Sequence, residues 1–152
     1  MDYNAAILVL LSLAPTIETR YTIPLAIAAG YNPLIVFATA SVLTFVLTAA
    51  LAYGLWILEL LIRKIPIIRD LWERYVNSAR RRVRPYVEKY GAPGVILFVA
   101  VPLPGTGVWT GSIAGYLLGI EPKKLMIYTT IGGIIANIIT FFVSVGVITM
   151  IL

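Results

Sequence analysis

Two short segments, APTIETRYTIP at residues 14–24 and VPLPGTG at residues 101–107, interrupt stretches of sequence that are otherwise strongly apolar. Proline removes a backbone donor and clashes with the preceding helical turn, and the residue before a proline avoids the helical conformation. The apolar stretches 3–29 and 94–118 are therefore each predicted to form two short helices of about 15–21 Å, roughly half a bilayer. Such a pair forms a re-entrant hairpin, which enters and leaves the membrane on one side. The residues predicted to break these hairpins are Pro15, Pro24, Pro102, Pro104, Gly105 and Gly107.

The composition of the whole chain is that of a membrane protein. Of its 152 residues, 60% are hydrophobic and 12% are charged, whereas about a quarter of the residues in a soluble domain are charged. Residues 34–62 and 125–152 are apolar, lack proline and are long enough to cross a bilayer as single helices. We therefore predict an all-α integral membrane protein of the cell membrane, with several crossings and one domain, residues 1–152.

Several kinds of chemistry are excluded by what the sequence lacks. The chain has no cysteine and no histidine, which excludes disulfides, thiolate nucleophiles, Cys/His zinc sites and histidine proton relays. It also has no nucleophile elbow and no cluster of carboxylates suited to a metal. We expect no metal, no cofactor and no enzymatic activity.

A constant offset of 89 residues relates the two halves of the chain. Pro15 at the break corresponds to Pro104, and Gly30 at the end of the second half-helix corresponds to Gly119. Pro33 at the start of the long helix corresponds to Pro122. This predicts two repeats, residues 1–62 and 93–152, each a re-entrant hairpin plus one transmembrane helix, joined by a basic linker at 63–92. The same offset relates two stripes of small or polar residues, predicted to face a pocket or a partner helix: Ser41, Thr44 and Thr48, and Thr130, Gly133 and Asn137.

The positive charges indicate how the repeats are oriented. If each half is a hairpin plus one crossing, the basic linker and the Lys123–Lys124 turn lie on the same side of the membrane. The positive-inside rule then places both in the cytoplasm, with both termini outside. If all four apolar stretches crossed fully, the two lysines would lie opposite the linker. The re-entrant arrangement makes the repeats inverted copies, which is the architecture of many secondary transporters.

The linker is predicted to be an amphipathic helix, because its apolar residues recur every three or four positions between Ile68 and Tyr90. One interpretation is that this helix lies on the cytoplasmic leaflet and fixes the orientation of the protein. A sharper interpretation is that its arginines gather lipid phosphates at the mouth of the pocket, namely Arg80, Arg81, Arg82 and Arg84. In both cases the expected partner is membrane lipid, and no nucleic acid is expected.

Glu18 and Arg20 are the charged residues that lie inside the apolar stretches and away from their ends. A charge at membrane depth costs at least about 2.5 kcal/mol, so such residues are functional candidates. In a functional role, Arg20 binds an anionic headgroup and Glu18, whose burial favours the protonated form, carries a proton. In a structural role, the pair locks the two hairpins together. Direct pairing at this spacing needs unwound backbone; otherwise each charge has another partner, such as Thr106, Asn137 or a substrate.

The second break, PLPGTGVWTG at residues 102–111, offers glycines together with the hydroxyls of Thr106 and Thr110. The backbone N–H groups at the start of the helix that follows attract anions. The segment lacks the lysine and the spacing of a P-loop, so nucleotide binding is not predicted. An equal alternative is that its glycines let the two hairpin tips touch.

The stretches APTIETRYTIPLAIAAGYNP at 14–33 and VPLPGTGVWTGSIAGYLLGIEPKK at 101–124 together resemble the small multidrug export protein family. That family is a distant relative of the DedA superfamily and of the eukaryotic VTT-domain lipid scramblases. The resemblance implies paired re-entrant hairpins that move polyprenyl-phosphate or phospholipid across the bilayer under a proton motive force. It matches Glu18 to the acidic residue of the first hairpin. DedA-like members have arginines in the second hairpin, whereas this chain has Thr106, Val108 and Trp109.

Three functions follow as hypotheses. The first is a transporter of lipid-phosphate or phospholipid that uses Glu18 and Arg20, with proton coupling through Glu18. The second is a proton-coupled exporter of small amphipathic compounds, and the third is a membrane scaffold without transport. Because broken backbone at membrane depth must be sheltered by protein, a homodimer or larger homo-oligomer is also predicted.

Overall fold

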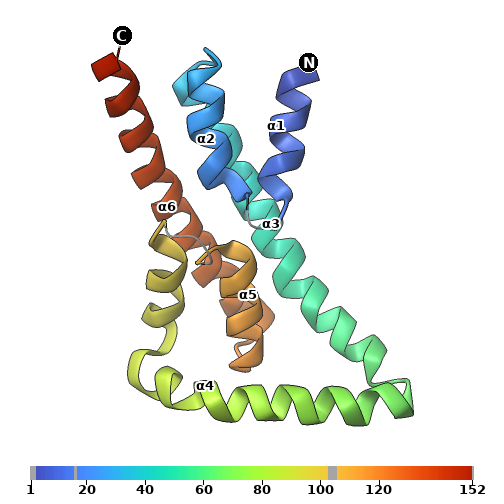
Figure 1. Cartoon of the computed structure of the whole chain (residues 1–152). Coiled ribbons are helices and arrows are strands. Elements are labelled where there is room, and N and C mark those ends of the chain that lie inside the picture. Colours follow the sequence, from blue (N-terminus) through green and yellow to red (C-terminus); the bar gives the residue numbers. More distant parts are fainter. Residues whose placement is uncertain (1–2, 16, 103–105, 152) are drawn as a thin grey trace.

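The computed structural model describes residues 3–15, 17–102 and 106–151, and these form helices and the turns that join them (Figure 1). The predicted all-α class is therefore confirmed. In chain order the helices are α1 (Tyr3–Leu13), α2 (Glu18–Ala28), α3 (Pro33–Ile62), α4 (Pro66–Ala100), α5 (Val108–Leu117) and α6 (Pro122–Ile151).

Two long helices, α3 and α6, cross each other at the centre of the molecule (Figure 1). Each has 30 residues and is long and apolar enough to span a membrane. The predicted polar stripes meet at this crossing. The hydroxyls of Thr48 and Thr130 are 2.6 Å apart, and the side-chain amide of Asn137 donates to the Thr44 hydroxyl at 2.9 Å. A Cβ at Gly133 would be 2.5 Å from the Thr44 methyl group, so a side chain at position 133 would require Thr44 to move. The stripes therefore join the two long helices.

Two helical hairpins pack against this pair of helices. The first consists of α1 and α2. The second consists of the last part of α4, after a kink at Gly91 (φ +50°, ψ −146°), and α5. In Figure 1 the hairpins open toward opposite ends of the molecule, and their turns lie close together near its centre. Pro15 lies in the first turn and Pro102 in the second, whereas Pro104 and Gly105 fall outside the described residues.

The prediction that Pro24 breaks the first hairpin is wrong, because Pro24 lies inside α2. A proline inside a helix removes one backbone hydrogen bond but has a φ angle that suits the helix. Helices packed among neighbours tolerate this loss, as prolines in transmembrane helices show. The chain turns instead at Ala14, Pro15 and Ile17.

The first part of α4, from Pro66 to the kink at Gly91, lies across one end of the molecule (Figure 1). Val76 is buried, and Trp72 packs on a cluster formed with Tyr116 and other apolar residues, whereas Leu71 is exposed. The helix therefore attaches to the body of the protein along part of its length. The predicted lipid-binding side chains on it, those of Arg80, Arg81, Arg82 and Arg84, fall outside the described part of the structure.

The offset of 89 residues also holds for the helix boundaries. The first and last residues of α3 lie 89 positions before those of α6. The turns before these helices also match, since Gly30 and Gly119 both have positive φ angles, +86° and +75°. Each is a conformation that glycine adopts without strain.

Candidate functional site

The carboxylate of Glu18 lies at the tip of the second hairpin. Its two oxygens accept hydrogen bonds from the backbone N–H groups of Val108, at 3.1 Å, and Trp109, at 3.0 Å. These are the first two residues of α5, so the carboxylate caps the N-terminus of a helix from the other half of the chain. The Glu18 side chain is buried, with the residue only 5% exposed. Its backbone is in the left-handed region, at φ +50°, where a non-glycine residue is strained by about 1–3 kcal/mol.

The guanidinium of Arg20 binds the other side of the same break. One terminal nitrogen donates to the carbonyl of Val101, at 3.0 Å, and to the hydroxyl of Thr106, at 3.3 Å. The other donates to the carbonyl of Val99. These carbonyls lie at the end of α4, where the helix leaves them without an intrahelical partner. Arg20 therefore caps the C-terminus that precedes the break.

Together the two charges complement the broken helix electrostatically. A helix carries partial positive charge at its N-terminus and partial negative charge at its C-terminus. Glu18 lies at the first kind of end and Arg20 at the second, and the Arg20 Nε atom is 3.8 Å from a Glu18 carboxylate oxygen. The pair is therefore in contact, but its shorter bonds are to the second hairpin. Through these bonds the pair joins the two hairpins.

A third contact runs in the opposite direction. The indole N–H of Trp109, in α5, donates to the carbonyl of Leu13 at the end of α1, at 3.2 Å. Trp109 is the residue that lies 89 positions after Arg20. Each hairpin thus supplies a donor to the helix end that precedes the break in the other.

A buried polar cluster lies beside these contacts. The Thr19 hydroxyl donates to the side-chain oxygen of Asn137 at 2.7 Å and lies 3.3 Å from the Thr44 hydroxyl. Asn137 is completely buried, and its hydrogen bonds go to threonines of α2 and α3. It therefore connects the first hairpin to both long helices. Among the described residues, no hydrogen bond joins Asn137 to Glu18 or Arg20.

The two threonines of the second break have local roles. The Thr106 hydroxyl donates to the Val101 carbonyl at 2.6 Å and accepts from Arg20. The Thr110 hydroxyl accepts from the Gly107 N–H at 2.8 Å, which supports the start of α5. Gly107 itself lies directly against the Glu18 carboxylate, and a Cβ there would be 2.6 Å from one carboxylate oxygen. The glycine thus lets the two tips touch, as one of the two interpretations proposed.

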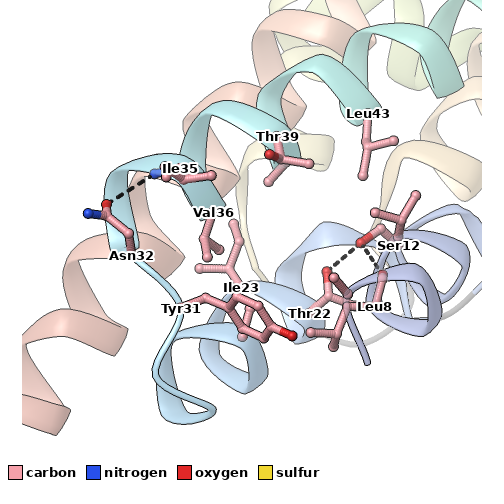
Figure 2. A pocket seen from close by; sticks show the side chains of 14 residues that line it. Leu8, Ser12, Thr22, Ile23, Tyr31, Asn32, Ile35, Val36, Thr39 and Leu43 are labelled. Carbon is pink, nitrogen blue, oxygen red and sulfur yellow. Dashed lines mark hydrogen bonds between the residues drawn. The ribbon is translucent and has the colours of Figure 1, made fainter. Parts of the chain in front are cut away.

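An open cavity of about 180 Å³ lies between α1, α2 and α3 (Figure 2). Its lining is mostly apolar, with hydroxyls from Ser12, Thr22 and Thr39. The Ser12 and Thr22 hydroxyls are 2.6 Å apart, which ties α1 to α2 at one edge of the cavity. Neither Ser12 nor Thr22 was among the predicted site residues, because nothing in their sequence context distinguishes them from hydroxyls that bond within one helix.

These features define a class of protein. Two helices suited to a membrane, two broken helical hairpins and a buried charge pair at their contact are typical of a membrane transporter. The model of the family described as "Putative small multi-drug export protein" matches residues 18–139, and the chain belongs to this family. No curated protein and no solved structure matches the chain. The relation to the DedA superfamily stays a prediction.

Proposed function

We propose that the chain exports small amphipathic compounds, and that the contact between the two hairpin tips opens and closes as a compound passes. The observation that carries this proposal is the capping of α5 and α4 by Glu18 and Arg20. When formed, these bonds join the two tips and would close a path between them. They also involve few groups, so a change in one of them can open it. The family supports export as the direction of transport.

The arrangement of the halves supports alternate opening toward the two faces of a membrane. We propose that residues 1–62 and 93–152 are inverted repeats and that both hairpins are re-entrant. The hairpins open toward opposite ends of the molecule (Figure 1), and the helix boundaries follow the 89-residue offset. The reciprocal donors Arg20 and Trp109 add a contact pattern consistent with a two-fold axis between the tips. Inverted repeats of this kind open alternately in many transporters.

A proton on Glu18 would couple this opening to a proton gradient. An ionised carboxylate accepts hydrogen bonds about twice as strong as those of a neutral group. Protonation would therefore weaken its bonds to Val108 and Trp109 and leave Arg20 without its counter-charge. The tip contact would loosen in the protonated state and re-form when the proton leaves on the other side.

A lipid-phosphate substrate has less support. The Arg20 nitrogens already donate to two carbonyls and a hydroxyl, and the N-terminus of α5 already holds the Glu18 carboxylate. A phosphate would have to displace these bonds. We therefore place amphipathic compounds before phospholipids. We also propose that the chain acts as a homo-oligomer, with the first part of α4, before the kink at Gly91, on the cytoplasmic face and both termini outside.

Glu18→Gln tests this function. The amide keeps an acceptor for α5 but cannot exchange a proton, so we expect at least a tenfold loss of ethidium transport driven by a pH gradient in proteoliposomes. Glu59→Gln is the matched control, because Glu59 pairs with exposed Arg63 on α3, and its transport should equal that of the wild type. Equal transport by Glu18→Gln would contradict proton coupling, and no transport by the wild type would favour the scaffold hypothesis. A fluorescent phospholipid assayed in parallel distinguishes the lipid substrate.

A further inference from the structure

We propose that the cavity between α1, α2 and α3 binds the apolar ring or short chain of a small amphipathic compound, whose polar end stays outside. This inference rests on the proposed export function and names the part of the substrate that is recognised. The cavity volume of about 180 Å³ is close to that of an engineered cavity of about 150 Å³ in another protein, which binds benzene. Whole drug-sized ligands need about 300–1,000 Å³, so the cavity fits one part of such a molecule.

The chemistry of the lining selects this kind of ligand. Of the described residues that line the cavity, none carries a charge. A phosphate or carboxylate would lose its hydration there without gaining a counter-charge. An apolar ring gains about 25 cal/mol for each Å² that it removes from water. Hydroxyls at the edge, such as that of Thr39 in Figure 2, suit the junction between apolar and polar parts of the ligand.

The cavity exists because the two halves differ at particular positions. In the second half, glycines let the last part of α4 lie directly on α5 and α6. A Cβ at Gly132 would be 2.8 Å from the carbonyl oxygen of Ile96 and 2.8 Å from Val99 Cβ. A Cβ at Gly111 would collide with a methyl group of Val99. A side chain at position 132 would therefore require the last part of α4 to move, and one at position 111 would require the Val99 side chain to move.

In the first half, the residues 89 positions earlier have side chains. Gly111 corresponds to Thr22 and Gly132 to Leu43, and both Thr22 and Leu43 line the cavity. These positions carry side chains in the first half, and α1 lies less closely on α3 than α4 lies on α6. The space left between α1 and α3 is the cavity. The difference between the two halves at these positions is therefore encoded in the sequence.

Photolabelling of the purified protein in nanodiscs tests this site. The probe is adamantyl diazirine, an uncharged cage of suitable size, and the labelled peptides are identified by mass spectrometry. We expect labelling concentrated in residues 5–43, at least fivefold above that of residues 94–132, and competed by excess 1-adamantanol. Thr39→Trp fills the cavity and should reduce the labelling at least fivefold. Ala38→Trp places the same ring on an exposed position of the same turn and should leave it unchanged.

Three outcomes would overturn the site. The first is equal labelling of the two halves. The second is labelling that Thr39→Trp does not reduce, although this variant elutes in gel filtration as the wild type does. The third is labelling that excess oleate competes away but excess 1-adamantanol does not. The last outcome would assign the cavity to a lipid chain. Because labelling needs no transport, the two proposals can fail separately. Specific labelling without ethidium transport would support the binding site and contradict the export function. Ethidium transport without specific labelling would support the export function and contradict the binding site.

Discussion

Glu18→Ala is expected to lower the free energy of unfolding by about 3–5 kcal/mol, the range observed when one partner of a buried ion pair is removed. The substitution leaves the N–H groups of Val108 and Trp109 without their acceptor. It also leaves the buried charge of Arg20 without its counter-charge. Relief of the strained backbone at position 18 is small by comparison, since alanine is also strained there. The measurement is unfolding by titration with SDS, followed by tryptophan fluorescence.

Glu121→Ala is the control for this prediction. Glu121 pairs with Lys124 at 3.2 Å on an exposed turn, where such a pair contributes about 0–1 kcal/mol. A loss for Glu18→Ala that is no larger than the loss for Glu121→Ala would show that the tip contact does not hold the hairpins together. Glu18→Gln should fall between the two, because its amide oxygen still accepts one hydrogen bond from α5.

Gly132→Leu is expected to destabilise the protein by about 3 kcal/mol, the upper end of the usual cost of overpacking. The added side chain meets a backbone carbonyl, that of Ile96, and the Cβ of Val99, neither of which can rotate away. The last part of α4 must therefore move off α6. The substitution gives the second half the residue that the first half has at Leu43. The same SDS titration measures the change.

Gly54→Leu is the matched control, because no atom lies within 4 Å of a Cβ built at Gly54 in α3. Leucine is a better helix former than glycine by up to about 1 kcal/mol, so this variant should be as stable as the wild type or slightly more stable. Equal stability of Gly132→Leu and the wild type would contradict the close packing on α6, and with it the explanation given for the cavity.

The main features of the fold could be predicted from the sequence because strong local signals set them. Pro15 and Pro102 lie in the turns of the two hairpins, where proline favours the end of a helix on steric grounds. Long runs without charge or proline made α3 and α6 predictable. Pro24 shows the limit of this reasoning, since packing of α2 against its neighbours outweighs the local effect of one proline.

The partners of the charged residues could be predicted only in part. The apolar sequence around Glu18 and Arg20 identified these two charges as candidate site residues. In the structure they bond to backbone groups of residues 99–109, about 80–90 positions away. Backbone groups leave no signal in the sequence, so a pairing with them could not be read from residue types. The cavity was not predicted for a related reason. Its lining includes Thr22 and Leu43, and their significance appears only when they are compared with the glycines at the corresponding positions of the other half.

Placement of single cysteines tests the central claim, that two hairpins from opposite faces meet at Glu18. The chain has no cysteine of its own, so each introduced thiol is the sole target of a membrane-impermeant maleimide applied to intact cells. We expect Asn4→Cys and Asn32→Cys to react from outside, and Lys64→Cys and Lys123→Cys to react only after the membrane is opened. This arrangement would be contradicted if Asn4→Cys and Asn32→Cys reacted from opposite faces. It would equally be contradicted if Lys64→Cys and Lys123→Cys did so.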